Sequence, residues 1–273
     1  MPPHRGLIAC FAPGGGLGHM NRAIALSLAL RDAGEDARIV TDSPFSPGLA
    51  ALTRCPIVHL PRENWAEAAR AYVEELRPAI VVTDTFPYGL REEWRLALPA
   101  AKLVHIARRL LTPFSLQAGD FALIIQAEPL APEHRAVLGS RSLTLCGPIL
   151  LAPGRVATPI PPALERDGLT LIVHSGPADE VAALTALAEP PYTVVSPWSP
   201  LEYYPATNLY ARARHIFTGA GYNSMADLLV HRHKHTALSF PRRFDDQHAR
   251  VQHFFRAPAD GTAQAVDAIL SLL

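Results

Sequence analysis

The sequence predicts an α/β protein made of two Rossmann-like domains that face each other across a cleft. Three observations support this fold class. Short apolar strand patterns alternate with helical patterns, a proline-rich stretch divides the alternation into two series, and polar or glycine-rich motifs follow several strands. Such alternation is typical of parallel sheets covered by helices, whose ligands bind beyond the carboxyl ends of the strands.

The first series supplies the elements of an N-terminal domain. Apolar runs rich in Val, Ile and Leu alternate there with longer segments of helical periodicity. We expect strands over Leu7–Ala12, Ala37–Thr41, Ile57–Leu60, Ala79–Thr83, Lys102–Ile106 and Phe121–Gln126, with helices between them.

The second series supplies a C-terminal domain. We expect strands over Thr170–His174, Thr193–Ser196, His215–Thr218 and Thr236–Phe240, and a helical tail from Ala263. Between the two series lie Gly147-Pro148 and the stretch 152–162, which together hold five prolines. Because proline breaks helices and stiffens linkers, we place the boundary there, with one domain over residues 1–150 and the other over 151–273.

The composition of the chain argues against several classes of protein. The 273 residues carry no formal net charge and the pI is about 7.2, so a nucleic acid is not an expected partner. The cysteines Cys10, Cys55 and Cys146 form no CxxC pair, which favours a reduced, cytoplasmic protein without a disulfide or zinc framework. No apolar run reaches the roughly 18 residues of a membrane span, so we expect a soluble protein.

A glycine-rich turn follows the first predicted strand. Residues 14–22 read GGGLGHMNR, and the helical pattern behind them stops before Gly34. Glycine-rich turns between a strand and a helix are typical of phosphate binding, which makes Gly16 and Gly18 candidate ligand contacts, although the GxGxxG spacing is missing. His19 lies at the mouth of this helix, and the ordinary pKa of histidine, about 6.5, lets the neutral ring accept a proton near neutral pH.

Asp84 directly follows the predicted strand Ala79–Thr83. Because parallel strands present their carboxyl ends at one edge of a sheet, we expect Asp84 on the same rim as His19. A carboxylate that holds one imidazole nitrogen fixes the histidine tautomer and raises its basicity. The alternative interpretation is that Asp84 only caps the following helix.

The second domain carries a motif that predicts a nucleotide-sugar pocket. Gly219, Ala220 and Gly221 would let a phosphate approach the backbone, and Asn223 and Ser224 add side-chain donors where a helix begins.

Three further polar residues extend this pocket. Asp227 lies one turn further along the helix, where its carboxylate can accept hydrogen bonds from ribose hydroxyls. After the next strand, Asp246 and Gln247 combine an acceptor with a mixed donor and acceptor, which suits the vicinal hydroxyls of a sugar.

Together these motifs resemble the donor box of the nucleotide-diphosphate-sugar glycosyltransferases of the GT-B fold, such as the plant-type glucosyltransferases and the bacterial peptidoglycan N-acetylglucosaminyltransferases. That box reads roughly Trp-x-Pro, then Gly-Trp-Asn-Ser-x-x-Glu, then Asp-Gln. Here residues 198–200 (WSP) look like its opening, and residues 221–227 (GYNSMAD) resemble its centre, with Tyr for Trp and Asp for Glu. Asp246-Gln247 resembles its end.

The resemblance implies further contacts with the donor. The indole of Trp198 would stack on the nucleotide base, and Ser175 and Gly176 resemble a loop that closes over the diphosphate. The alternatives are a core position for Trp198 and an ordinary turn at Ser175-Gly176-Pro177. The plant-type pattern has a phosphate-binding histidine where this chain has Gly219, so phosphate contact is expected to rest on backbone and hydroxyl groups.

The first loop is similar to the same superfamily through its Gly-x-Gly-His-x-x-Arg pattern. This similarity implies that His19 is a general base and that Asp84 orients it. The chain is then an inverting glycosyltransferase that uses a nucleotide-diphosphate sugar, preferably a UDP-sugar, and a hydroxyl acceptor, without a metal or other cofactor. The alternatives are a nucleotide-sugar hydrolase in which His19 activates water, and a non-catalytic nucleotide-sugar-binding protein.

Two other patterns have simpler interpretations. His231, His233 and His235 alternate, but no carboxylate or cysteine lies at ligand spacing, so we expect an exposed basic connection there and no metal site. Residues 108–111 (RRLL) with Phe114 could make a weak peripheral membrane contact, as in transferases with lipid acceptors. The alternative places these apolar residues in the core and the arginines in solvent.

Overall fold

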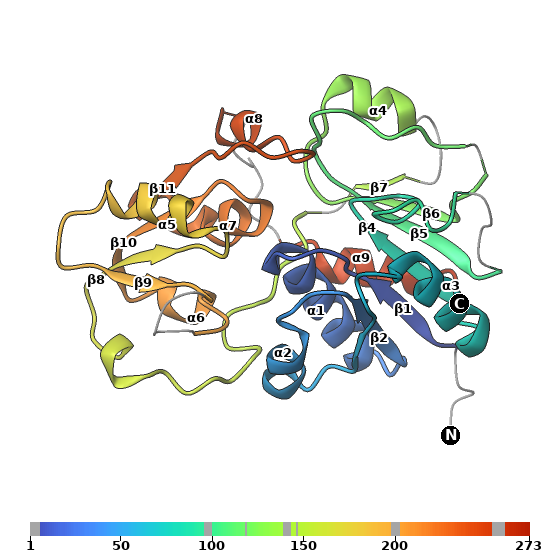
Figure 1. The fold of residues 1–273 in the computed structure, drawn as a ribbon, viewed down its shortest axis with the longest axis horizontal. Helices are drawn as coiled ribbons and strands as arrows, with labels where there is room; N and C mark the ends of the chain where they lie inside the picture. The colour runs from blue at the N-terminus through green and yellow to red at the C-terminus, as the bar shows by residue number, and fades with distance from the viewer. Residues whose placement is uncertain are drawn as a thin grey trace. The chain divides into compact units, whose positions relative to one another are not determined.

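The computed structural model describes residues 6–95, 100–117, 119–138, 143–145, 147–197, 203–252 and 260–273. The chain forms two compact units: unit 1 comprises Met1–Leu150 and Ala259–Leu273, and unit 2 comprises Leu151–Pro258. Each unit contains a parallel β-sheet and helices, as Figure 1 shows. The structure therefore has the α/β class that the sequence predicts.

Unit 1 is built on a parallel sheet of seven described strands. Their order is β3-β2-β1-β4-β5-β6-β7, so the sheet grows in one direction from β1 to β3 and in the other from β4 to β7. The bounds are β1 Ile8–Phe11, β2 Ala37–Thr41, β3 Ile57–His59, β4 Ile80–Asp84, β5 Lys102–Ala107, β6 Leu123–Gln126 and β7 Leu143–Leu145. The strand order reverses between β1 and β4, the position where ligands of such sheets bind.

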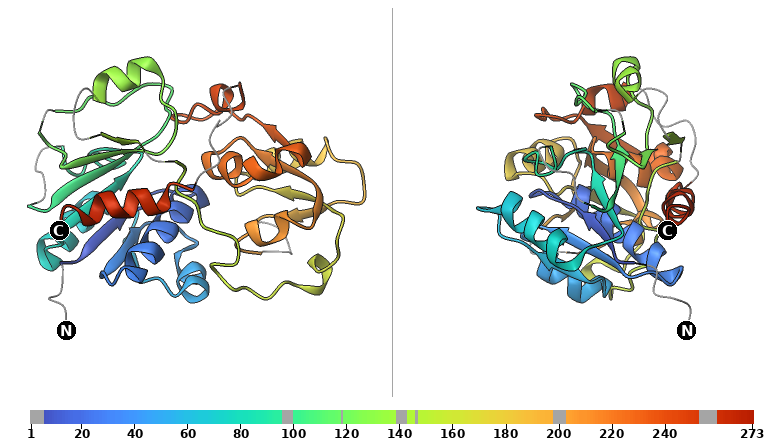
Figure 2. Two further views of the ribbon diagram at one scale, coloured as in Figure 1. Left: turned by 180° about the vertical axis from the view of Figure 1, so that it is seen from behind. Right: turned by 90° about the vertical axis from the view of Figure 1, so that its right-hand side faces the viewer.

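Helices cover both faces of this sheet. They are α1 Leu17–Asp32, α2 Ser46–Thr53, α3 Trp65–Leu76, α4 Pro132–Leu138 and α9 Thr262–Leu270. Figure 2 shows α1 and α9 on one face and α3 on the other. Helix α1 buries Met20, Ile24 and Leu30 completely, and Leu26 is only 1% exposed, so the helix is covered on more than one side.

Unit 2 has a smaller parallel sheet of four described strands in the order β11-β10-β8-β9. The strands are β8 Leu169–Val173, β9 Thr193–Val195, β10 Ala213–Gly219 and β11 His235–Leu238, and the helices are α5 Ala178–Thr185, α6 Thr207–Tyr210, α7 Tyr222–Asp227 and α8 Gln247–Gln252. Short 3₁₀ segments cover Pro162–Leu164 and Leu229–Lys234. The strand order reverses between β8 and β10, which are hydrogen-bonded neighbours.

The C-terminal helix corrects the predicted extent of the second domain. The sequence interpretation assigned all of residues 151–273 to that domain, but α9 packs against α1 and β6 of unit 1. The start of α9 is fixed there by hydrogen bonds: the Thr262 hydroxyl accepts from the Leu150 amide at 3.0 Å, and the Gly261 amide donates to the Pro148 carbonyl at 2.7 Å. Apolar periodicity predicts a helix but does not say which sheet the helix covers.

The other differences are small. The sequence did not predict β7, because three residues are too few to show a period. Within the described residues, no helix combines the length and the apolar character needed to cross a membrane.

The contact at Gly261 gives a test of how α9 docks. A Cβ atom at residue 261 would lie 2.0 Å from the carbonyl oxygen of Gly147, so the backbone would have to move. We expect Gly261→Ala to lower the free energy of unfolding by about 1–3 kcal/mol, measured by urea denaturation. Gly48→Ala in α2 is the matched control, because its Cβ meets nothing within 4 Å. Equal stability of the two variants would show that the close contact is absent.

Candidate active site

The glycine-rich turn after β1 is held by the chain that follows β2. The Gly14 amide donates to Asp42 Oδ1 at 2.6 Å, and Gly14 has φ +118°, a conformation that favours glycine. Asp42 is itself paired with Arg62, whose Nε lies 3.0 Å from Asp42 Oδ2. Gly16 is the extended N-cap residue of α1, and Gly18 lies in its first turn.

His19 and Asp84 are in direct contact. His19 lies in the first turn of α1, Asp84 is the last residue of β4, and Nδ1 of the imidazole lies 2.8 Å from Oδ2 of the carboxylate. An ionised carboxylate can only accept, so the proton of this bond lies on Nδ1 and neutral His19 keeps its lone pair on Nε2. The Asp84 side chain is 5% exposed and that of His19 is 20% exposed. In this geometry Nε2 is the ring nitrogen that can accept a proton from another group.

Arg22 completes this cluster from the next turn of α1. Its Nη2 donates to Asp84 Oδ2 at 2.5 Å and its Nε to Oδ1 at 3.1 Å, with only 1% of the arginine exposed. Burial alone raises the pKa of Asp84, but the charge of Arg22, followed by that of His19 and by the hydrogen bonds, holds this pKa well below its usual range. Arg22 belongs to the motif in the sequence, yet no role was predicted for it, because the sequence does not show that a buried carboxylate needs it.

The backbone after Asp84 is strained. Thr85 is buried and has φ +70°, which is unusual for a β-branched residue. The strain is held by bonds to neighbouring strands and side chains: the Thr85 amide donates to the Ile106 carbonyl at 3.0 Å and the Thr85 hydroxyl to Asp84 Oδ1 at 3.2 Å. Strained residues persist where the surrounding structure fixes them, and they cluster at functional sites. The sequence left open whether Asp84 holds His19 or only caps a helix. In the structure its carboxylate bonds to His19 and Arg22.

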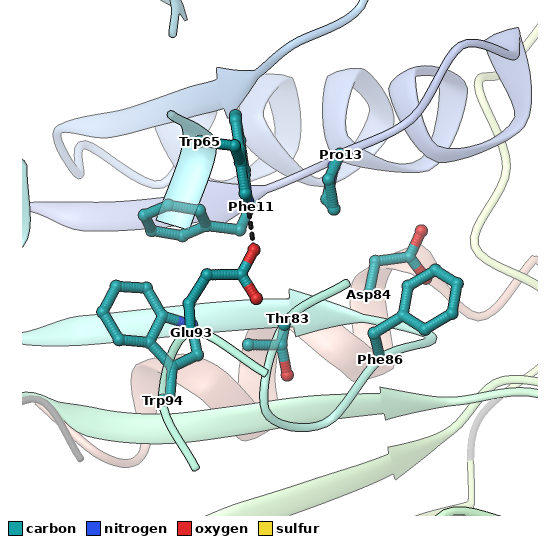
Figure 3. A pocket seen from close by; sticks show the side chains of 9 residues that line it. Phe11, Pro13, Trp65, Thr83, Asp84, Phe86, Glu93 and Trp94 are labelled. Carbon is teal, nitrogen blue, oxygen red and sulfur yellow. Dashed lines mark hydrogen bonds between the residues drawn. The ribbon is translucent and has the colours of Figure 1, made fainter. Parts of the chain in front are cut away.

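A narrow pocket of about 10 Å³, with room for about one water molecule, lies next to Asp84 within unit 1. Figure 3 shows its lining, in which Phe86 and Asp84 lie at one end and the buried Glu93 lies among aromatic rings at the other. The Phe86 ring is stacked near His19, with ring centres 5.8 Å apart. The lining residues are Phe11, Pro13, Trp65, Thr83, Asp84, Phe86, Gly89, Glu93 and Trp94.

Glu93 is a buried carboxyl group that the sequence did not identify. It accepts hydrogen bonds from the Trp65 indole N–H and from the Arg91 amide, and burial raises the pKa of Glu93 above its usual range. These bonds fix Glu93 as part of the wall of the pocket.

In unit 2 the predicted donor motif follows β10. Gly219 ends this strand, Ala220 is fully buried with its amide bonded to the Leu238 carbonyl at 2.9 Å, and Gly221 is the extended N-cap residue of α7. Asn223 and Ser224 lie in α7 and are partly exposed.

The other predicted donor residues take different positions. Asp227 ends α7 and is partly exposed. Asp246 accepts the Ala249 amide at 3.0 Å, at the start of α8. Gln247 is 5% exposed and its Oε1 accepts the Phe240 amide at 3.0 Å, so this oxygen holds the loop after β11.

Arg250, which was not predicted as a site residue, holds the loop that follows β10. The arginine is 2% exposed, and its Nη1 donates to the Ala220 carbonyl at 3.1 Å while Asp245 binds both of its terminal nitrogens. The i, i+5 spacing of Asp245 and Arg250 gives no helical-pair signal in the sequence, which is why the pair was missed.

The remaining predictions are placed as follows. Ser175 and Gly176 lie between β8 and α5, partly exposed, whereas Trp198 lies outside the described residues. The described residues contain no group of three or more His, Cys, Asp or Glu that could hold a metal ion.

The Arg108 region does not form a uniformly exposed basic surface. Arg108 is buried beside Glu128, with Nε 3.5 Å from Oε1, and Leu110 is in the core. Leu111 is 56% exposed. Arg108 is thus not the solvated arginine that the alternative to membrane contact assumed.

Comparison with known proteins identifies the fold. The glycosyltransferase of kitacinnamycin has a TM-score of 0.57 and 15% sequence identity, with 99% of this chain and 100% of that chain covered. SsfS6, a glycosyltransferase of Streptomyces sp. SF2575 in complex with thymidine diphosphate, has a TM-score of 0.55 and 14% identity, covering 98% and 86% of the chains. The chain therefore has the GT-B fold.

This fold is shared with other activities. A putative UDP-N-acetylglucosamine 2-epimerase from Listeria monocytogenes has a TM-score of 0.55 at 10% identity, covering 97% of this chain and 87% of the other. No protein-family model matches the sequence, and no curated protein matches it either. At these identities the likeness establishes the fold, and the site itself has to carry the function.

The Arg22–Asp84 pair should be the most sensitive polar contact of the site. Arg22→Met leaves a buried carboxylate without its main compensating charge, so we expect a loss of about 3–5 kcal/mol in the free energy of unfolding. Arg38→Met is the control, because Arg38 and Asp36 form an exposed pair at 2.8 Å and such pairs contribute less than about 1 kcal/mol. Urea denaturation at pH 7 measures both, and equal losses would contradict the assigned role.

The same pair gives a signed pH dependence. The pKa of Asp84 is lowered in the folded state, so its ionised form stabilises the protein above the ordinary aspartate value of about 3.9 and this contribution is lost as the pH falls towards the folded-state pKa. We expect the stability difference between the wild type and Asp84→Asn to shrink between pH 5 and pH 2. A constant difference over this range would show that Asp84 is not held ionised.

Proposed function

We propose that the protein is an inverting, metal-independent glycosyltransferase that moves a sugar from a nucleotide-diphosphate sugar to a hydroxyl acceptor. The observation that carries the proposal is the contact between His19 and Asp84 at 2.8 Å, with Arg22 fixing the carboxylate. Acceptor activation is assigned to unit 1 and donor binding to unit 2.

The acceptor step follows from the histidine tautomer. Nε2 of His19 takes the proton of the acceptor hydroxyl as the acceptor oxygen forms a bond to the anomeric carbon of the donor. The bond from this carbon to the diphosphate oxygen breaks, and its electron pair leaves with the nucleoside diphosphate. Attack opposite the leaving group inverts the configuration, and the positive charge that forms on His19 is stabilised by the ionised Asp84.

An apolar wall next to His19 suits part of the acceptor. It is formed by the Phe86 ring, which also contacts the Phe114 ring with centres 5.7 Å apart. We assign this wall to an apolar part of the acceptor, whose reacting hydroxyl would lie next to His19.

Donor binding is assigned to the carboxyl end of the unit 2 sheet. The loops after β8 and β10 leave the sheet where its strand order reverses, as in other sheets that bind nucleotides. Gly219, Gly221, Asn223 and Ser224 would then contact the diphosphate and Asp227 the ribose. Ala220 is fully buried and both of its backbone polar groups are bonded, so we assign it to the support of the loop and not to a phosphate contact. Since Gln247 holds the Phe240 amide through Oε1, its amide nitrogen is the group left to contact the sugar.

The nucleotide is best sought among uridine and thymidine diphosphate sugars. The donor box favours uridine by resemblance, while one of the structural neighbours is complexed with thymidine diphosphate. A thermal-shift screen of both series, with the free diphosphates included, identifies the ligand because binding to the folded state raises the melting temperature.

The role of His19 predicts a large and selective loss of activity. His19→Gln should retain donor binding and lose about 100-fold or more in turnover, the usual contribution of positioned proton transfer. Asp84→Asn should lose less, because a neutral amide can still accept from the imidazole. His59→Gln is the control, since this exposed histidine of β3 bonds to Ser46 at 2.9 Å, away from Asp84. Wild-type turnover by His19→Gln would rule out the mechanism.

Assays with the donor alone separate the proposal from its alternatives. Stoichiometric sugar release without any acceptor would favour a hydrolase in which His19 activates water. Tight binding of the donor, with no sugar release and no transfer to any acceptor tested, would favour a non-catalytic binding protein. Transfer that persists at the same rate in EDTA is expected if helix termini and N–H groups, in place of a metal, stabilise the leaving diphosphate.

The donor assignment predicts a localised loss of affinity. Asp227→Ala removes an acceptor for the ribose hydroxyls and should weaken donor binding by about 1.5–3 kcal/mol, measured by calorimetry. Asp167→Ala is the control in the same unit. This carboxylate is 86% exposed, and its nearest charged partner, Arg212, is 3.8 Å away, so the pair is weak. Unchanged affinity in Asp227→Ala would move the ribose site elsewhere.

A further inference from the structure

His174 lies at the reversal of strand order in unit 2. It directly follows β8, and Val173 is paired with Thr218, so His174 and Gly219 are side by side at the ends of β8 and β10. The histidine is 10% exposed. His174 was not identified as a site residue from the sequence. With Glu180 and Arg242, described below, it forms a cluster that we call the His174 cluster.

Two glycines shape the space that the His174 ring occupies. A Cβ atom at Gly219 would lie 2.6 Å from Cε1 and 2.9 Å from Nδ1 of the imidazole, and a Cβ atom at Gly176 would lie 2.3 Å from Nε2. The ring therefore lies directly against the backbone of both loops assigned to the diphosphate. A side chain at residue 176 or 219 would therefore displace the His174 ring.

The two ring nitrogens have different environments. Nε2 lies 2.7 Å from Glu180 Oε2, in α5. Within the described ranges, Nδ1 has no hydrogen-bond partner, and the ring edge that carries it faces Gly219. The Phe240 ring covers the histidine, with centres 5.3 Å apart.

Arg242 sets the charge of this cluster. Its Nη1 and Nη2 donate to both oxygens of Glu180, at 2.5 and 2.6 Å, so the carboxylate is already neutralised. Among the residues that the structure describes, the ionisable groups that act on His174 are Glu180 from α5 and Arg242 from the segment after β11. On the β10 side the ring meets Gly219, which has no side chain. A proton on His174 would leave the cluster with one net positive charge.

We propose that His174 contacts the donor diphosphate through Nδ1 and takes up a proton when the diphosphate binds. The inference rests on the proposed function, because it assumes a nucleotide-diphosphate donor in unit 2. The reaction is a simple proton uptake: solvent supplies a proton to the Nδ1 lone pair, and the resulting N–H donates to a phosphate oxygen. The charge-assisted bond forms only with the anion present.

The resting state of the ring agrees with this proposal. Burial, the largest effect, lowers the pKa of His174, the bond to Glu180 opposes it, and the charge of Arg242 lowers the pKa further. The free protein therefore holds the ring neutral at neutral pH. A bound diphosphate adds negative charge and raises this pKa, so donor affinity must fall as the pH rises through the value in the complex.

Calorimetry with UDP-glucose and thymidine diphosphate-glucose tests the inference. Their diphosphates are diesters, which have no group that titrates between pH 6 and 8.5, so any proton uptake belongs to the protein. Titrations in two buffers of different ionisation heat should give an uptake above zero in the wild type, and affinity should fall with rising pH by up to tenfold per unit. Zero uptake with a pH-independent affinity overturns the proposal, whichever variants fold.

Three variants assign the effect. His174→Ala should bind about tenfold or more weakly at pH 6.5 and lose the proton uptake. Arg242→Gln should reduce the uptake, because the unshared Glu180 charge then keeps His174 protonated before binding. His215→Ala is the control, as this histidine of β10 bonds to Thr236 at 2.9 Å and not to Glu180.

The outcomes separate this inference from the proposed function. If the wild type binds a nucleotide sugar and His174→Ala binds it equally well, the inference fails and the transferase proposal stands. If the wild type binds neither nucleotide sugar at millimolar concentration, both fail.

Discussion

The ion pair between Arg22 and Asp84 is the interaction on which the site in unit 1 depends. A carboxylate that is 5% exposed needs a compensating charge, and Arg22 supplies it. Its Nη2 donates to Oδ2, the oxygen that also holds His19, and its Nε donates to Oδ1. The pair keeps Asp84 ionised, and ionised Asp84 in turn decides which nitrogen of His19 carries the proton. One helical turn of α1 thus provides both the imidazole that bonds to Asp84 and the cation that fixes this carboxylate.

The same principle operates in unit 2 with different residues. The buried Arg250 pairs with the partly exposed Asp245 next to the loop after β10, and Arg242 pairs with Glu180 beside His174. In each case an arginine neutralises a carboxylate close to a strand end. The Arg250 pair holds the loop backbone at Ala220, whereas the Arg242 pair holds the side chain of His174 through Glu180.

Much of the fold could be predicted from the sequence, because the signal is local. Strands such as Ala37–Thr41 and Ile80–Asp84 contain short runs of Ile and Val, which favour strands, and the glycines before α1 mark a turn whatever the rest of the chain does. The contact between His19 and Asp84 could also be anticipated, since the carboxyl ends of parallel strands share one edge.

Contacts that depend on three-dimensional packing could not be predicted. Arg22 and Asp84 are 62 residues apart, and nothing in either segment shows that the carboxylate is buried. The positive φ of Thr85 contradicts the preference of a β-branched residue, so local propensity misses it. Gln247 was assigned to sugar hydroxyls on its chemistry, but the structure uses its oxygen to hold the Phe240 amide.

The docking of α9 has a consequence for how the protein is made. Unit 2 is inserted between the two parts of unit 1, so the ribosome must translate all of Leu151–Pro258 before α9 can cover α1. At about 5–20 residues per second this takes roughly 5–20 seconds. During that interval unit 1 exposes the apolar face that α9 later buries, and unit 2 has the opportunity to fold first although it is encoded later.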